Sequence, residues 1–159
     1  MINIKIILLL LFLLFSSCSK ESNSILDINT SIFNSSINFK GSSQTLDIIT
    51  WNIKNYPKNN LTNYYVNEII DSLDVDIIAL QEIEDNDYFS DLSESLGNDW
   101  YSYRSDSPSS DWGELAFLIN TTEVEIVTNP YTILDNYQYD FSYREPFVIE
   151  CNYKNELLI

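Results

Sequence analysis

The feature of this sequence that most constrains its fold is an alternation of buried strands with amphipathic helices. Residues 45–53 and 75–82 are rich in β-branched and apolar side chains, which is typical of buried strands. Between them, residues 61–73 carry apolar side chains at steps of three and four, the period of an amphipathic helix. Residues 85–96 repeat that period, with acidic residues in the first turn and Gly97 as a C-cap. This order predicts an α/β (α+β) domain with helices packed on one face of a mixed sheet.

The rest of the chain is expected to add strands, after a loop at residues 106–113 that contains Pro, Ser and Gly. The expected strands share short length and β-branched or aromatic side chains; they are residues 100–104, 114–120, 123–127, 131–134, 146–153 and 156–159. We expect the second and third of these to pair as a hairpin through Thr121 and Thr122. The last two are expected to form a hairpin around Lys154 and Asn155.

Composition excludes several classes of function. The chain has 159 residues, 8 Lys and Arg, 24 Asp and Glu, no His, and a formal net charge of -16. Without imidazole no His-dependent catalytic triad or zinc site can be built, and two Cys are too few for a structural zinc site. The charge disfavours a non-specific nucleic-acid binder with a general basic surface. This excess of acidic over basic residues is typical of the surface of a soluble, exported protein. It does not indicate which substrate the protein binds.

The N-terminus resembles the signal of a bacterial lipoprotein. Lys5 precedes an unbroken apolar run, residues 6–15, which is shorter than the about 20 residues needed to span a bilayer. The run ends in Phe-Ser-Ser-Cys18, similar to a lipobox with Phe in place of the usual Leu. Residues 1–17 are therefore expected to be a signal peptide and Cys18 the lipidation site, so that the chain is exported and lipid-anchored to the cell envelope of a bacterium. The alternative is an ordinary cleaved signal with an incidental Cys.

Two further segments follow from this interpretation. Residues 18–44 are expected to be the lipidated Cys and a flexible tether rich in Ser and Asn, and residues 45–159 the folded domain. Because Cys18 lies at the signal, the two Cys do not indicate a disulfide framework. Cys151 is expected to be a small buried thiol in the last long strand.

Two polar motifs stand at the ends of the first two predicted strands. Asn52, in Thr-Trp-Asn-Ile, is followed 30 residues later by Glu82, in Gln-Glu. Because consecutive strands that flank one helix lie close together, we expect both side chains on one rim of the sheet. A carboxylate beside an amide oxygen suits Mg²⁺, which usually takes one or two carboxylates and keeps several waters. For each residue alone, the alternatives are a turn-forming Asn and a solvated Glu.

A third motif is Tyr143-Arg144-Glu145-Pro146-Phe147, at the start of a predicted strand. The planar guanidinium of Arg144 matches the geometry of phosphate oxygens. The alternative is a surface Arg that pairs with a neighbouring carboxylate.

The three motifs together resemble the endonuclease/exonuclease/phosphatase superfamily, and within it the pancreatic-type deoxyribonuclease branch, over residues 46–159. The resemblance implies the N-terminal half of a four-layered α/β sandwich and Mg²⁺-dependent hydrolysis of a phosphodiester substrate such as DNA. It also implies that Glu82 is a ligand of a weakly held Mg²⁺, Mn²⁺ or Ca²⁺ ion. By the same resemblance Asn52 assists metal and phosphate binding, and Arg144 contacts the substrate backbone.

The sequence also departs from that family. Leu115 stands where the deoxyribonuclease branch has an aromatic hydroxyl, and the family's later His, Gly-Asp-x-Asn and Asp-His motifs have no counterpart. The chain is therefore expected to be a truncated domain, inactive by itself, with a separately encoded C-terminal half as a partner. The alternative function is a non-catalytic acidic surface lipoprotein that retains the half-fold as a binding or assembly element.

Overall fold

The computed structural model describes residues 39–106 and 113–159. The expectations for the signal peptide, for Cys18 and for most of the tether fall outside the described residues. Of the helices in the described part of the chain, none combines the length and the apolar character needed to cross a membrane.

The described chain alternates strands and helices and then continues as strands. Its elements are β1 (Ile48–Tyr56), α3 (Thr62–Leu73), β2 (Ile77–Ile83), α4 (Asn86–Leu96), β3 (Trp100–Arg104), β4 (Glu114–Asn120), β5 (Val124–Thr132), the 3-10 helix η2 (Asp135–Tyr137), β6 (Phe147–Tyr153) and β7 (Glu156–Leu158). The order strand, helix, strand, helix expected from the sequence is thus confirmed.

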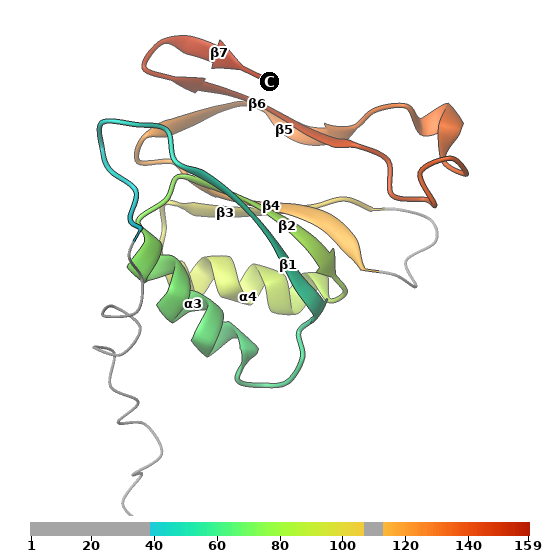
Figure 1. The fold of residues 1–159 in the computed structure, drawn as a ribbon, viewed down its shortest axis with the longest axis horizontal. Coiled ribbons are helices and arrows are strands. Elements are labelled where there is room, and N and C mark those ends of the chain that lie inside the picture. The colour runs from blue at the N-terminus through green and yellow to red at the C-terminus, as the bar shows by residue number, and fades with distance from the viewer. Residues whose placement is uncertain (1–38, 107–112) are drawn as a thin grey trace, which may run out of the picture. The chain divides into compact units, whose positions relative to one another are not determined.

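These strands form two sheets. In the first sheet the order is β1-β2-β4-β3, with β1 and β2 parallel and the other pairs antiparallel, and in the second sheet it is β5-β6-β7. Figure 1 shows α3 and α4 on one face of the four-stranded sheet and the three-stranded sheet on its other face. The mixed sheet with helices on one face is confirmed, and the arrangement corresponds to part of an α/β sandwich.

Each helix presents its apolar stripe to the first sheet. Val66 and Ile70 of α3 and Phe89 and Leu92 of α4 are buried in one core with Ile78 of β2. Helix α4 is capped at its N-terminus by Asp85, whose side chain accepts a hydrogen bond from the Tyr88 backbone N–H at 2.9 Å. It ends at Gly97, whose φ of 119° is accessible mainly to glycine, as the sequence predicts.

A second core lies between the two sheets. It contains Ile77, Ile119, Val124 and Cys151, all buried, so the expected buried thiol at Cys151 is confirmed. Burial raises the pKa of the Cys151 thiol, which keeps the thiol neutral. This core fixes the two sheets against one another.

The predicted hairpin of residues 114–120 and 123–127 is wrong. Strand β4 pairs with β2 on one side and β3 on the other, so neither edge of β4 is left for β5. The chain instead crosses to the second sheet, where β5 pairs with β6. Residues expected as a separate strand at 131–134 belong in part to β5, which runs on to Thr132. The last predicted hairpin, β6 with β7, is confirmed.

Candidate functional site

The site lies where β1 and β2 lose regular pairing. Asn52 is the register partner of Gln81, but the next paired residues are Tyr56 and Ile83. On its other side β2 pairs Leu80 with Ala116 and then Ile83 with Glu114, so β2 has one residue more than β4 over this stretch. That is a β-bulge, and Glu82 has a left-handed φ of 62° within it.

The bulge decides which way Glu82 points. Ile78 and Leu80 face the helices, so regular alternation would place Glu82 on the helix side as well. Ile83 occupies the helix-side core instead. Glu82 is thereby released from that core, and its side chain meets Asn52, which is exposed at the same rim.

Two groups of β1 hold the Glu82 carboxylate. The Asn52 amide donates from Nδ2 to Glu82 Oε1 at 2.9 Å, and the Asn55 backbone N–H donates to Glu82 Oε2 at 3.2 Å. Asn55 itself has a left-handed φ of 55°, and its side chain donates to Glu84 Oε1 at 2.6 Å. The sequence prediction that Asn52 and Glu82 share one rim is therefore confirmed. Asn55 and Glu84 were missed because they lie within irregular backbone.

The same contacts favour the ionised form of Glu82. Its pKa is lowered chiefly by the hydrogen bond from Asn52, against a smaller opposing effect of desolvation. The Asn55 N–H and the positive charges of Lys54 and Arg144 lower the pKa further. Glu82 is consequently a carboxylate at neutral pH, which is the form that binds a cation.

Arg144 lies in the connection between β5 and β6 and contributes its charge to this rim. Its side chain is half-buried and lines a pocket of about 530 Å³ with Tyr139, Ser142 and Tyr143. The positive charge of Arg144 is the smallest of the effects that act on the Glu82 pKa. Of the three residues selected from the sequence, Asn52 and Glu82 are in direct contact, whereas Arg144 acts on the Glu82 carboxylate only through its charge.

Gly113 was not predicted as part of this site, yet it packs against the Glu82 bulge. A Cβ built on Gly113 would lie 2.7 Å from Glu82 Cα and 2.8 Å from Glu82 C. Its φ of 68° also favours glycine. The position just before β4 therefore has to be glycine for the bulge to keep this shape.

We expect Gly113→Ala to lower the free energy of unfolding by about 1–3 kcal/mol, because the new methyl group meets backbone atoms that cannot rotate away. It should also shift the NMR resonances of Asn52 and Glu82. Gly97→Ala is the matched control, since φ at Gly97 is 119° but a Cβ there meets nothing within 4 Å. Urea titration and backbone amide spectra measure both effects. Unchanged Asn52 and Glu82 resonances in Gly113→Ala would contradict this role.

Arg104 is a second residue that the sequence did not single out. Its Nε donates to the Ile83 carbonyl oxygen at 2.9 Å. Because Ile83 directly follows Glu82, this bond fixes the backbone on the far side of the bulge. Arg104 is therefore a structural support of the site.

The donor set at this rim fits a weakly held divalent ion. Glu82 offers a carboxylate that accepts one hydrogen bond on each oxygen and retains further lone pairs, and Asn52 offers an amide beside it. Within residues 39–106 and 113–159, no group of three or more Asp, Glu, Cys or His side chains is arranged as a metal site. A hard ion that keeps several waters needs no such group.

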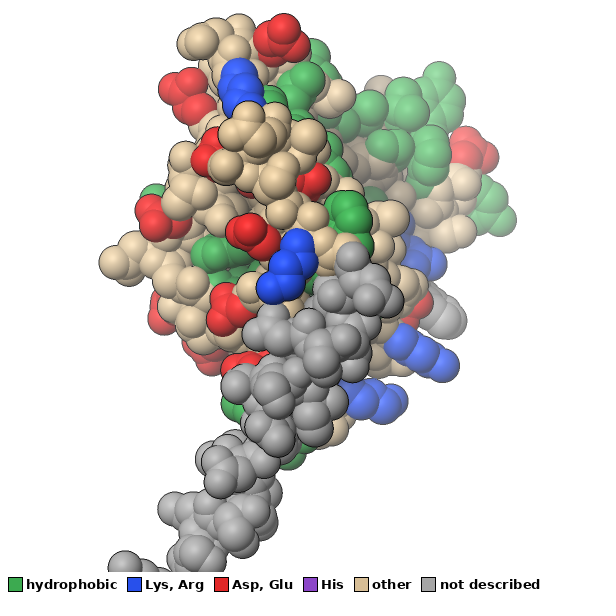
Figure 2. All heavy atoms as spheres, turned by 60° about the vertical axis from the view of Figure 1, so that its left-hand side comes forward, with side chains coloured by type: hydrophobic (Ala, Val, Ile, Leu, Met, Phe, Trp, Pro, Cys, Tyr) green, Lys and Arg blue, Asp and Glu red, His purple; other side chains and the backbone are tan. Residues whose placement is uncertain are grey.

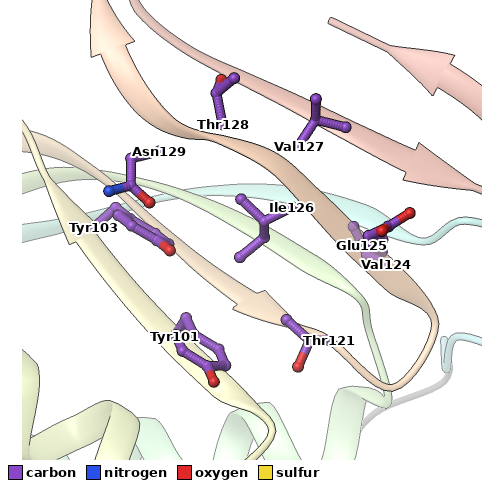
Figure 3. Close-up of a pocket in the computed structure, with 9 residues that line it drawn as sticks. All are labelled: Tyr101, Tyr103, Thr121, Val124, Glu125, Ile126, Val127, Thr128 and Asn129. Carbon is purple, nitrogen blue, oxygen red and sulfur yellow. The ribbon is translucent and has the colours of Figure 1, made fainter.

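A second hollow, of about 430 Å³, opens at the opposite edge of the first sheet. Figure 3 shows Tyr101 and Tyr103 of β3 on one side and Ile126 of β5 on the other. Since β3 and β1 are the two outer strands of this sheet, the hollow is separate from the Glu82 rim.

Comparison with known proteins identifies the fold. No family model matches the sequence, and no curated protein matches it. The crystal structure of humanized D. rerio TDP2, carrying 14 mutations, matches with a TM-score of 0.56 and 19% identity over 73% of this chain and 48% of that chain. D. rerio TDP2 complexed with single-strand DNA product matches with a TM-score of 0.56 and 17% identity, over 71% of this chain and 43% of that chain.

Over the matched residues the fold of this chain is similar to that of TDP2. The chain spans about half the length of these solved chains. The fold expected from the three sequence motifs is therefore confirmed.

Proposed function

We propose that this chain is the metal-binding half of a Mg²⁺-dependent phosphodiester hydrolase, of the pancreatic-type deoxyribonuclease kind. The observation that carries the proposal is the Glu82 carboxylate, which is ionised, lies half-buried on a bulge and is held by two donors of β1. The likeness to TDP2 supports it, because one of the TDP2 structures contains single-strand DNA product. A nucleic-acid phosphodiester is accordingly the substrate class that we propose.

In this proposal each residue has a distinct task. Glu82 and Asn52 hold the ion, which is Mg²⁺ or, as a substitute, Mn²⁺ or Ca²⁺. The bound ion supplies charge that stabilises the developing negative charge on phosphate oxygens. Arg144 binds a non-bridging phosphate oxygen through its planar guanidinium. Asn55 and Gly113 keep the Glu82 carboxylate in position, since its affinity for the ion depends on that orientation.

A partner completes the site. β1 and β7 are outer strands, and beside them lies an apolar groove of about 210 Å³ whose lining includes Ile48, Phe117 and Ile149. Ile48 is 58% exposed there, which is unusual for a strand residue between two sheets. We infer that a separately encoded C-terminal half covers this groove and supplies His side chains for acid–base catalysis, of which residues 1–159 contain none.

The metal site is tested by Mn²⁺ titration of the full chain, followed by NMR line broadening. We expect the amides around Asn52 and Glu82 to broaden first, because a paramagnetic ion relaxes nearby nuclei. Glu82→Gln keeps the shape but removes the charge, and should weaken Mn²⁺ binding at least tenfold. Glu94→Gln, which removes the same charge from an exposed position on α4, is the control. Equal broadening in the wild type and in Glu82→Gln would refute the site.

We further propose that Cys18 carries lipid and anchors the domain to a bacterial membrane, outside the cytoplasm. The apolar run before Cys18 and the acidic composition support this location. Labelling with a fatty-acid analogue should mark the wild-type chain, and Cys18→Ser should lose the label. Equal labelling of both chains would argue against the anchor.

A further inference from the structure

The connection between β5 and β6, residues 133–146, exposes tyrosine rings next to Arg144; we call it the aromatic loop. Tyr139 is 83% exposed, Tyr137 is 56% exposed and Tyr143 is 41% exposed. Exposed aromatic side chains gathered in one segment are a feature of binding surfaces. None of the roles proposed above uses these rings.

The aromatic loop is held in shape by its own backbone. The Tyr143 N–H donates to the Gln138 carbonyl oxygen at 2.8 Å, and the Asp140 N–H donates to that of Tyr137 at 2.9 Å. At the base of the loop the Ile133 N–H donates to the Pro146 carbonyl oxygen at 3.0 Å. A ligand that binds a preformed loop loses less conformational entropy than one that must order it. The tyrosine rings therefore already hold their positions before a ligand binds.

The pocket at this loop combines two kinds of contact. It has a volume of about 530 Å³ and is lined by Tyr139, Ser142, Tyr143 and Arg144. This volume lies within the range of small-ligand sites, roughly 300–1,000 Å³. The phenol rings offer flat apolar faces, whereas Arg144 offers a fork of donors to an anion. The chemistry fits a planar aromatic group joined to a phosphate.

The charge of the protein indicates how such a ligand would be held. On the face shown in Figure 2, acidic side chains are scattered over the described part of the chain, and the Lys and Arg side chains do not form a continuous patch. With a net charge of -16, the chain gains little from following a phosphate backbone by charge alone. Stacking of bases on aromatic rings does not require net positive charge, and every base has a face that can stack.

We propose that the aromatic loop is a subsite for an unpaired nucleobase of single-stranded nucleic acid, with the base stacked on Tyr139, the most exposed of the three rings, and the adjacent phosphate on Arg144. The inference builds on the proposed function, since it specifies the substrate as single-stranded. A duplex keeps its bases stacked on one another and offers none to the loop.

Equilibrium binding of a short fluorescent oligothymidylate to the full chain, in detergent and EDTA, tests this subsite. Tyr139→Ala should bind the oligonucleotide on the order of tenfold more weakly, and Tyr139→Phe, which keeps the ring, should bind as the wild type does. Tyr101→Ala is the matched control, because Tyr101 is 49% exposed and lines the other hollow. An abasic strand with the same number of phosphates should bind weakly and equally to wild type and Tyr139→Ala.

The inference is overturned if the abasic strand binds as tightly as the oligothymidylate, or if Tyr139→Ala and Tyr101→Ala weaken binding equally. Stacking needs no metal, so the assay in EDTA is independent of the Glu82 site. Failure of Mn²⁺ broadening with intact Tyr139-dependent binding would therefore count against the proposed hydrolase alone. Intact Mn²⁺ broadening without Tyr139-dependent binding would count against the subsite alone.

Discussion

The isolated chain is expected to cleave phosphodiesters no faster than its Glu82→Ala variant, even at millimolar Mg²⁺. Attack of water on a phosphodiester needs a base or a metal-bound hydroxide as well as charge stabilisation. General acid–base catalysis contributes roughly 10²–10⁴-fold, and the chain contains no His to provide it. Glu82 with Asn52 gives a single carboxylate, and because the Asn52 side chain is exposed, an ion bound there would be open to water. Robust Glu82-dependent cleavage of plasmid DNA or of a nitrophenyl phosphodiester by the chain alone would overturn this expectation.

Addition of a separately expressed C-terminal half of the same fold should raise turnover by at least about a hundredfold, because it would contribute His side chains for acid–base catalysis. The gain should vanish in Glu82→Ala and persist in Glu94→Ala, which alters an exposed carboxylate of α4. A mixture that stays inactive while the two halves bind would favour the alternative function, a non-catalytic acidic lipoprotein that uses the half-fold for assembly.

Tyr56→Ala is expected to cause the largest loss of stability, about 3–5 kcal/mol in the free energy of unfolding. The Tyr56 side chain is fully buried at the end of β1. Its ring meets the rings of Tyr88 and Phe89 edge-on, with centroids 6.0 Å away in both cases. Removal of the ring leaves a cavity between β1 and α4 that surrounding side chains fill only in part. Urea unfolding measures the loss.

The Tyr56→Phe variant distinguishes the contribution of the aromatic ring to stability from that of its hydroxyl group. The Tyr56 hydroxyl donates to Asn63 Oδ1, so the Phe variant should lose only about 1–2 kcal/mol. Burial raises the pKa of Tyr56, helped by nearby Tyr88 and Asp85. Since the unfolded chain ionises near pH 10, wild-type stability should fall as the pH rises above that value. The Phe variant should lack this part of the decline. An identical alkaline profile for both proteins would contradict the burial of this hydroxyl.

Local periodicity was sufficient to predict most of the fold. The four-residue steps of α3, the acidic first turn of α4 and its Gly97 C-cap are each encoded within a few residues, so they can be recognised without knowledge of the rest of the chain. The β4–β5 pairing was predicted wrongly because a short connection between two strands looks alike whether they pair or diverge. What excluded the pairing is that β2 and β3 already occupy both edges of β4, which no local pattern records.

For the candidate site too, the sequence predicts one part and the tertiary structure decides the other. The sequence by itself determined the participants: an Asn and a Glu at the ends of two neighbouring strands, and an Arg before a later one. Only the tertiary structure decided that Glu82 meets Asn52, because in a regular β2 the side chain of Glu82 would point into the helix-side core, away from Asn52. The left-handed residue at Glu82 reverses that direction, and the backbone of Gly113 fits against the bulge only because it has no Cβ. A bulge depends on the packing of residues 31 positions apart, and a pattern read along one strand does not contain that information.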